Sequence, residues 1–173
     1  MPLGKITTKA VCVADWMTES VLAVEIFDSI ATARQLMAKH RINQLPVLEN
    51  DSLVGIVTDR DIRDAYPTSM LIGRPKEIDA FAQSYTVEEV MTHDIFTVRP
   101  ETPLATAVSL LRRHRIGSLP VVKNKQLVGI ITRSDILDFV LSGAARKAPT
   151  GGQRPVKKTN KLRRTNRLNR KQT

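Results

Sequence analysis

The sequence predicts a mixed α/β protein in which two similar βαββα repeats pack together as one module. Two observations lead to this prediction. Residues 16–65 align without a gap with residues 90–139, and 22 of the 50 aligned pairs are identical. Within each copy, apolar runs of strand length alternate with segments whose apolar residues recur at helical spacing. A unit of this size buries little apolar surface alone, so we expect the two copies to form one body.

Charge is distributed unevenly along the chain. The formal net charge is +10, and residues 143–173 hold eleven Lys or Arg and no acidic residue. Residues 1–142 carry sixteen basic and seventeen acidic groups. Because the basic segment has few large apolar residues, it is predicted to be disordered. The predicted organisation is a lead-in (1–15), repeat one (16–66), a connector (67–89), repeat two (90–142) and a basic tail (143–173).

The first predicted elements of each repeat are a strand and a helix. Residues Val21–Ile26 are expected to form the strand, and the helix is expected to run to His40 from a cap at Asp28 or Ser29. In repeat two, Thr102 is predicted to cap the helix and Pro103 to occupy its first position, where the missing N–H costs nothing.

A hairpin and a second helix complete each repeat. Two apolar strands flank the polar turn 49–52 in repeat one, and the turn 123–126 in repeat two. The second helix is expected at Asp59–Ala65 and at Arg133–Leu141. In the connector, proline and glycine at 67, 73 and 75 break regular structure, and a short helix is predicted over Glu77–Tyr85.

The remaining composition narrows the protein class. The single cysteine, Cys12, excludes an internal disulfide, fits a reducing compartment and is interpreted as a small buried residue. No apolar run approaches the ~20 residues of a membrane span, and the N-terminus has no signal-peptide pattern. We therefore expect a cytoplasmic protein without membrane contact. Three His and one Cys give no metal-ligand spacing, so no metal site is expected.

Both copies share one polar signature at the end of the hairpin. A buried strand ends in Thr58 or Thr132, a helix begins, and Asp61 or Asp135 follows three residues later. A helix start presents free N–H groups that suit a phosphate, and a carboxylate can accept both hydroxyls of a ribose. The same pattern is also that of a capping box, in which threonine and acid bind each other's main-chain amides. The two interpretations are compatible, and the sequence leaves both open.

Several repeated motifs together resemble a tandem pair of CBS domains. They are Met-Thr at the start of each copy, His-Arg-Ile before Leu-Pro-Val, and Val-Gly-Ile-x-Thr-x-x-Asp at the end. The resemblance covers about residues 16–141, and the closer similarity is to stand-alone bacterial and archaeal pairs of the acetoin-utilisation type. It implies a pseudo-two-fold arrangement with two clefts, each able to bind an adenosyl ligand (AMP, ADP, ATP or S-adenosylmethionine), and no required cofactor.

The resemblance also implies which residues form each cleft. One cleft would combine the front of repeat one with the helix start of repeat two, through Thr18, Leu22, Ala23, Ile42, Asn43, Thr132, Arg133 and Asp135. The other would use Thr92, Phe96, Thr97, Ile116, Gly117, Thr58 and Asp61. The apolar members would sandwich the adenine.

Two further pairs are candidate phosphate contacts, namely His40 with Arg41 and His114 with Arg115. They end the first helix of each repeat, where cations are favourable for the helix dipole alone, and both interpretations stay open. The two clefts are not expected to be equal. Arg133 would favour an anion at the position where repeat one has Asp59, so the cleft of Thr132 and Asp135 is predicted to bind more tightly.

These inferences define two hypotheses. The first is a non-catalytic regulatory module that binds adenine nucleotides, forms a homodimer through its helical faces and signals to a protein partner. The second is a protein associated with nucleic acid or another polyanion through residues 144–173, with the paired repeats as a dimerisation scaffold. No catalytic domain accompanies the repeats, so we do not expect an enzyme.

Overall fold

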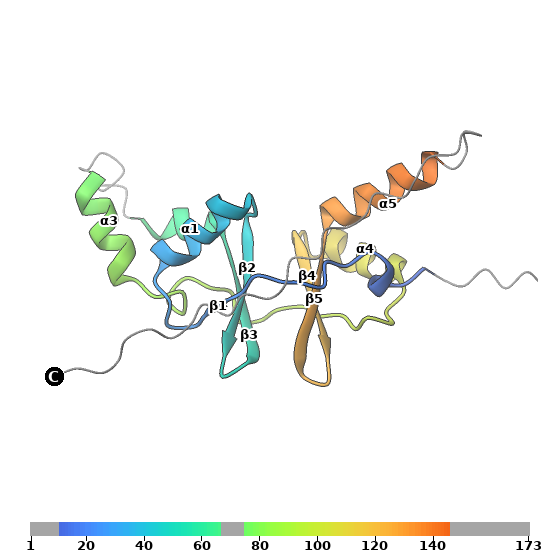
Figure 1. Ribbon diagram of the computed structural model, residues 1–173, viewed down its shortest axis with the longest axis horizontal. Coiled ribbons are helices and arrows are strands. Elements are labelled where there is room, and N and C mark those ends of the chain that lie inside the picture. The colour runs from blue at the N-terminus through green and yellow to red at the C-terminus, as the bar shows by residue number, and fades with distance from the viewer. Residues whose placement is uncertain (1–10, 67–74, 146–173) are drawn as a thin grey trace, which may run out of the picture.

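A computed structural model describes residues 11–66 and 75–145 of the chain (Figure 1). The predictions for residues 146–173 of the basic tail and for the breaks at Pro67 and Gly73 lie outside the described residues, as do the first ten residues of the lead-in. Residues 143–145, predicted to begin the disordered tail, instead belong to the last helix of the described chain. In the described ranges, no helix is both long enough and apolar enough to cross a membrane.

The elements follow the duplicated order. Repeat one contains β1 (Val24–Glu25), α1 (Ile30–His40), β2 (Gln44–Glu49), β3 (Ser52–Thr58) and α2 (Asp59–Ala65). Helix α3 (Pro75–Ser84) lies between the repeats and packs against α1. Repeat two contains α4 (Leu104–Arg113), β4 (Ser118–Lys123), β5 (Gln126–Thr132) and α5 (Arg133–Ala145). A single 3-10 turn, η1 (Val13–Asp15), precedes repeat one.

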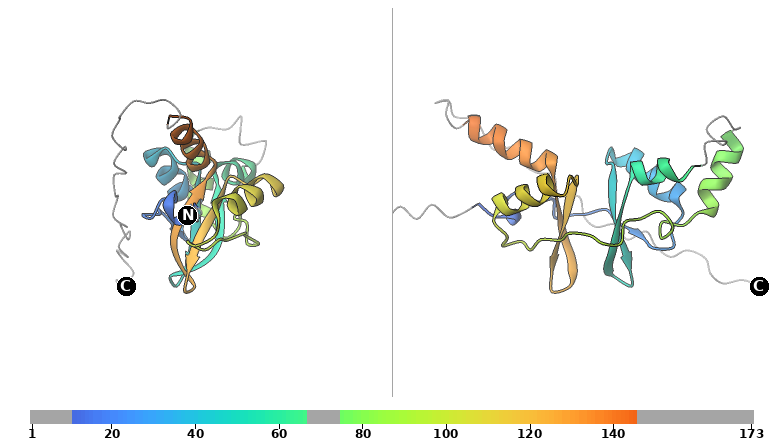
Figure 2. Two further views of the ribbon diagram at one scale, coloured as in Figure 1. Left: turned by 90° about the vertical axis from the view of Figure 1, so that its right-hand side faces the viewer. Right: turned by 180° about the vertical axis from the view of Figure 1, so that it is seen from behind.

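Two hairpins form the centre of the molecule. β2 pairs with β3 and β4 with β5, both antiparallel and with equivalent register. The hairpins stand side by side, with α1, α2 and α3 on one outer side and α4 and α5 on the other (Figures 1 and 2). β1 adds a short parallel strand to β2, whereas repeat two keeps only the equivalent bridge between Val98 and Val121. The predicted first strand is therefore much reduced in both copies.

The hairpin turns use left-handed backbone conformations. Asn50 and Asp51 have φ of 50° and 64°, and Asn124 and Lys125 have φ of 51° and 66°. Two successive positive φ values define the type I′ turn, whose twist matches that of the strands it joins. The turn therefore fixes the register of each hairpin.

The structure decides between the two predicted caps of α1 and corrects several other helix ends. Ser29 is the cap, because its hydroxyl accepts a hydrogen bond from the Thr32 amide at 3.2 Å. Thr102 does not cap α4; its hydroxyl accepts from the Arg99 amide at 3.0 Å, and Pro103 is the N-cap residue. The helix expected to end at residue 141 continues to Ala145, and the predicted short helix begins and ends slightly earlier, as α3.

The two hydrophobic cores exchange their leading segments. The core of repeat one includes Val87 and Met91, which precede repeat two, whereas the core of repeat two includes Val13 and Met17, which precede repeat one. Thr18 exchanges two main-chain hydrogen bonds with Ile130 of β5, at 2.9 and 3.0 Å. The equivalent Thr92 bonds Ile56 of β3 in the same way. The core of each repeat is thus completed by the segment that precedes the other repeat in the chain.

A glycine in each hairpin admits the crossing segment. A Cβ atom at Gly55 would lie 2.7 Å from the Met91 sulfur and 2.8 Å from the Thr92 carbonyl oxygen. At Gly129 it would lie 2.7 Å from the Met17 sulfur. The repeated Met-Thr and Val-Gly-Ile motifs therefore have a structural reason, because the first packs on the second across the two repeats.

The structural equivalence of the repeats extends further towards the N-terminus than their identical residues do. The Cys12 amide donates to the Asp15 carboxylate at 2.9 Å, and the Thr86 amide donates to Glu89 at 2.7 Å. The Cys12 thiol also donates to Asp15, at 3.2 Å, and is half-buried. Cys12 therefore takes a capping position, not the fully buried one that its apolar neighbours suggested.

Candidate functional site

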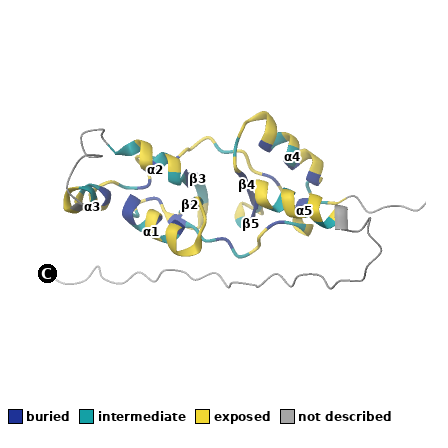
Figure 3. Cartoon of the chain, turned by 90° about the horizontal axis from the view of Figure 1, so that it is seen from above, coloured by how far each residue is buried: buried dark blue, intermediate teal, exposed yellow. Residues whose placement is uncertain are grey.

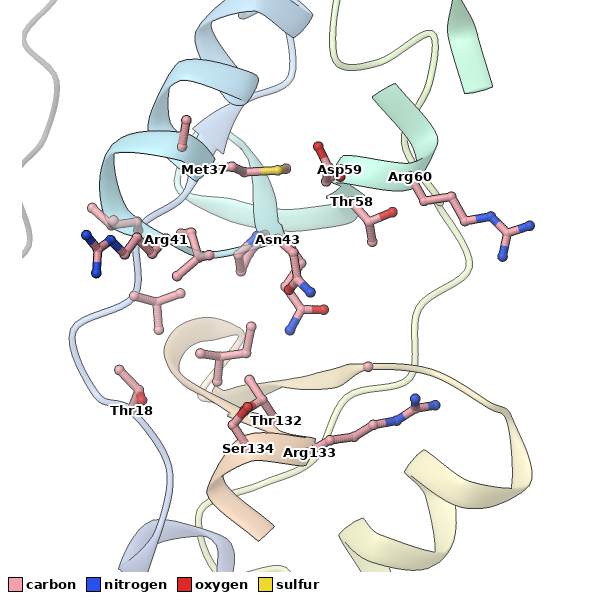
Figure 4. Close-up of a pocket in the computed structure, with 18 of the residues that line it drawn as sticks. Thr18, Met37, Arg41, Asn43, Thr58, Asp59, Arg60, Thr132, Arg133 and Ser134 are labelled. Atoms are coloured by element: carbon pink, nitrogen blue, oxygen red, sulfur yellow. The ribbon is translucent and has the colours of Figure 1, made fainter. Parts of the chain in front are cut away.

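A cavity of about 1060 Å³ lies between the two repeats. The segment 18–22, the end of α1 and the start of α2 line one part of it, and the start of α5 lines another. Figure 4 shows Thr58, Asp59 and Arg60 on one side of the space and Thr132 and Arg133 on the other. Its volume slightly exceeds the usual range of small-molecule sites, roughly 300–1,000 Å³.

The start of α5 forms one wall of the cavity. The Asp135 carboxylate accepts hydrogen bonds from the Thr132 amide and hydroxyl, both at 2.8 Å, and the Asp135 amide donates to that hydroxyl at 3.4 Å. These bonds satisfy the capping interpretation of the motif. They use only Oδ2 of Asp135, and in the described part of the chain Oδ1 accepts no hydrogen bond, so the carboxylate keeps an acceptor for a ligand.

The start of α2 repeats this arrangement. The Asp61 carboxylate accepts from the Thr58 amide and hydroxyl at 2.8 and 2.7 Å. Thr58 lines the cavity, but Asp61 does not. The two capping boxes are therefore locally alike and differ in their relation to the cavity.

The structure brings together most residues of the first predicted cleft. The members of this predicted cleft that line the cavity are Thr18, Leu22, Ile42, Asn43, Thr132, Arg133 and Asp135. Only Ala23 of that set lies outside the lining. These residues come from the front of repeat one and the helix start of repeat two, as the resemblance implied.

Residues of the second predicted cleft are divided. Thr58 and Gly117 line the same cavity, whereas Thr92, Phe96, Thr97, Ile116 and Asp61 do not. The Phe96 ring stacks on His114, with centroids 3.9 Å apart and an interplanar angle of 29°. The equivalent residue of repeat one is Leu22, which lies in the cavity wall. The two repeats thus differ in how they use this apolar position.

Of the four candidate phosphate contacts, only Arg41 lines the cavity. Its backbone is left-handed, with φ of 54°, and it ends α1. Arg115 has the same conformation, with φ of 55°, but it and the two histidines lie outside the lining. A left-handed conformation is uncommon for a residue other than glycine and is one way to end a helix.

Sequence reasoning missed several charged residues of the cavity. Arg34 lies within α1, Arg41 directly follows this helix, and Arg60 and Arg63 belong to α2. No repeated motif marks Arg34, because Val108 stands at the equivalent position of repeat two. The hairpin and helix packing that turns α2 towards the cavity leaves no signal in the sequence either.

The carboxylate of Asp59 forms an ion pair within the cavity wall. Its Oδ2 atom pairs with Nε of Arg63 at 3.0 Å. On the opposite side, Nε of Arg133 donates to the Ile116 carbonyl at 3.0 Å. The repulsion between Asp59 and an anion that the sequence suggested is therefore offset by its neighbour.

Two other features of the described residues bear on the chemistry of the protein. No group of three His, Cys, Asp or Glu side chains in the ranges 11–66 and 75–145 could hold a metal ion. The pKa of Glu89 lies below its usual range, because the Thr86 amide and hydroxyl donate to its carboxylate. Glu89 does not line the cavity.

Comparison with known proteins identifies the family. The CBS domain profile matches residues 13–68 and 87–142, so the chain belongs to the CBS domain family. A CBS domain-containing protein of Dictyostelium discoideum is 31% identical over 133 residues, which are 76% of this chain and 92% of that protein. The chain also matches enzymes, of whose length it spans between 14% and 23%.

Solved structures show the same fold. The Vibrio cholerae protein assigned to acetoin utilization, AcuB, is similar with a TM-score of 0.68 and 28% identity, over 83% of this chain and all of that one. The CBS domain pair of protein MJ0100, in complex with 5′-methylthioadenosine and S-adenosyl-L-methionine, is similar with a TM-score of 0.65 and 26% identity, over 78% of this chain and 99% of that one.

Proposed function

We propose that this CBS pair is a non-catalytic regulatory module that binds an adenosyl ligand of the AMP, ADP, ATP or S-adenosylmethionine type. The observation that supports the proposal is the cavity between the repeats, whose wall combines apolar side chains with a helix start and its carboxylate. The similar MJ0100 pair is in complex with two adenosyl compounds, which favours the same ligand class here.

The cavity suggests a role for each group. Leu22 and Ile42 would contact the two faces of the adenine, and Oδ1 of Asp135 would accept hydrogen bonds from the ribose hydroxyls. The Ser134 amide at the start of α5 would bind a phosphate, since a helix N-terminus carries partial positive charge and the Arg133 and Asp135 amides already have acceptors within the protein. Thr18 and Asn43 would line the edge of the base.

Regulation would follow from ligand contacts with both repeats. A ligand that binds one mutual arrangement of the repeats more tightly than another shifts the population towards it. We propose that the change passes to a protein partner through the relative orientation of the repeats or the arrangement of segment 66–89. A homodimer is part of the proposal, favoured by the exposed apolar side chains Leu137, Val140 and Leu141. They belong to α5, part of which is coloured as exposed in Figure 3. Sedimentation analysis of the full chain tests for this homodimer.

The test is a thermal-shift and titration screen with matched aspartate variants. A ligand at 100 times its dissociation constant stabilises the folded protein by about 2.7 kcal/mol. Asp135→Ala and Asp61→Ala remove equivalent capping bonds, so each should cost about 1 kcal/mol of stability. Only Asp135→Ala should also remove most of the ligand shift. Equal ligand shifts in both variants and the parent would mean that the aspartates serve capping alone.

The second candidate function rests on the eleven basic residues of segment 143–173. Such a segment binds polyanions by releasing counterions, with affinity that falls steeply as salt rises. Deleting residues 144–173 separates the two candidates. Nucleotide binding should survive the deletion under the first, and RNA or DNA binding should be lost under the second.

A further inference from the structure

The cavity carries an excess of positive charge. Five arginines line it, two from the α1 segment (Arg34 and Arg41), two from α2 (Arg60 and Arg63) and one from α5 (Arg133). Only two carboxylates, Asp59 and Asp135, line the same space, which leaves a surplus of three formal positive charges. This surplus lies within a protein whose first 142 residues carry a net charge of −1.

The two carboxylates are already engaged by the protein. Asp59 pairs with Arg63 at 3.0 Å, and Asp135 accepts two hydrogen bonds from Thr132 at 2.8 Å. Arg60 reaches Asp64 at 3.4 Å, but both side chains are more than two-thirds exposed, so this pair contributes little. The acidic groups of the wall therefore do not neutralise the remaining arginines.

Three arginines remain without a carboxylate partner in the described part of the chain. No ion pair involves Arg34, Arg41 or Arg133 there. Arg34 donates to the Tyr66 hydroxyl at 3.5 Å, and Arg133 donates Nε to a carbonyl at 3.0 Å. Each guanidinium has five N–H donors, so most of these donors stay available to a ligand.

This arrangement suits a ligand whose negative charge extends over several groups. Guanidinium forks match phosphate oxygens in geometry and charge. Six residues, roughly 9 Å along the axis of α1, separate Arg34 from the helix end at His40, which Arg41 follows, and Arg133 lies on the opposite repeat. A chain of phosphates can meet guanidinium groups that are spread in this way. S-adenosylmethionine has a sulfonium and an ammonium group against one carboxylate, so it brings net positive charge into the same space and is disfavoured.

We propose that the cavity selects adenosyl ligands with two or more phosphates over neutral or cationic ones, and that Arg34 and Arg41 set this preference. The inference depends on the adenosyl binding proposed above and narrows its ligand class. It assigns a ligand-selecting role to Arg34, a side chain that no sequence motif marked.

The experiment is titration calorimetry of the full chain, without divalent cations, against ATP, ADP, AMP, 5′-methylthioadenosine and S-adenosylmethionine. ATP and ADP should bind at least tenfold more tightly than 5′-methylthioadenosine, and the difference should shrink as salt rises. Arg34→Gln and Arg41→Gln should each weaken ATP binding about five- to tenfold. Binding of 5′-methylthioadenosine should stay within twofold of the parent in both variants.

Two controls exclude non-specific attraction to the basic segment of the chain. Arg112→Gln removes the same charge from an exposed position on α4 outside the cavity and should leave ATP binding within twofold. An excess of 5′-methylthioadenosine should displace ATP from the cavity, whereas ATP held by the tail would remain.

The outcomes separate the two proposals. If 5′-methylthioadenosine or S-adenosylmethionine binds as tightly as ATP, or if both arginine variants bind ATP like the parent, the charge selection is wrong and adenosyl binding stands. If none of the five compounds binds, the proposed function itself is wrong. ATP that cannot be displaced by 5′-methylthioadenosine also overturns the selection, because its site is then elsewhere.

Discussion

Replacing Gly55 by alanine tests how the two repeats are joined. The added Cβ would lie 2.7 Å from the Met91 sulfur and 2.8 Å from the Thr92 carbonyl oxygen. The side chain can move, but Thr92 is held by two main-chain hydrogen bonds to Ile56, at 2.9 and 3.0 Å. The substitution must therefore displace the crossing segment from β3.

The expected cost follows from two opposing effects. Overpacking of a well-packed site costs about 1–3 kcal/mol. Replacing glycine restricts the unfolded chain and returns about 0.4–1 kcal/mol. Gly55→Ala should therefore lower the free energy of unfolding by about 1–2 kcal/mol, and for a chain of this size each kcal/mol corresponds to a fall in Tm of roughly 2–4 °C.

Urea denaturation followed by circular dichroism measures the change, with Gly143→Ala as the matched control. Gly143 lies in α5, and its added Cβ would meet nothing within 4 Å. Alanine there should stabilise the protein by about 0.5–1 kcal/mol, through helix propensity. If Gly55→Ala is as stable as the parent, the close approach at β3 is not real.

A second glycine refines the same test. At Gly129 the nearest main-chain atom, the Thr18 oxygen, would be 3.1 Å away, so most of the clash involves the Met17 side chain. Met17→Ala should therefore recover the stability that Gly129→Ala loses. Met91→Ala should recover only part of the stability that Gly55→Ala loses, because the Thr92 oxygen remains. Equal rescue in both pairs would contradict this difference.

Three further predictions follow from the local geometry. Lys125→Gly should raise the free energy of unfolding by about 0.5–1 kcal/mol in urea titrations, because residue 125 has a φ of 66°; a loss of stability would contradict the turn assignment. The hydrogen bonds that lower the pKa of Glu89 stabilise the folded state above the ordinary value of 4.5, and this contribution should disappear as the pH falls through the lowered pKa. Glu89→Gln should lack this pH dependence of stability when Tm is measured across a pH series. Identical Tm profiles for the variant and the parent would exclude a contribution from Glu89. The two predicted clefts should bind adenosyl ligands unequally, with the Thr132 cleft the tighter, and calorimetry that gives two equal sites would refute this.

Much of the fold could be predicted because its signals are local. The turn residues, the apolar strands and the threonine-to-aspartate spacing each act within a few positions of the chain. Helix α2 begins and ends where the sequence placed it, at Asp59–Ala65. The Thr58 and Thr132 capping boxes formed as the capping interpretation required. The less accurate predictions, such as the Thr102 cap, depended on competing local hydrogen bonds of similar strength.

The candidate site was only partly open to prediction. Asp135 could be proposed from the repeated threonine-to-aspartate signature, and Thr18 was implied by the family resemblance. Arg34 and Arg63 were missed, since neither belongs to a repeated motif and each reaches the cavity through helix packing. The different placement of Phe96 and Leu22 also escaped prediction, because it depends on ring stacking with His114.

By itself, the sequence determined that the protein is a duplicated α/β unit with a polar signature at two helix starts, since repetition, alternation and capping are properties of short segments. Only the tertiary structure decided that each repeat is completed by the segment preceding the other, and that arginines from three helices line one cavity. These features arise from contacts between residues far apart in the chain. Their geometry is set by how side chains of particular sizes pack, as where Met17 meets Gly129.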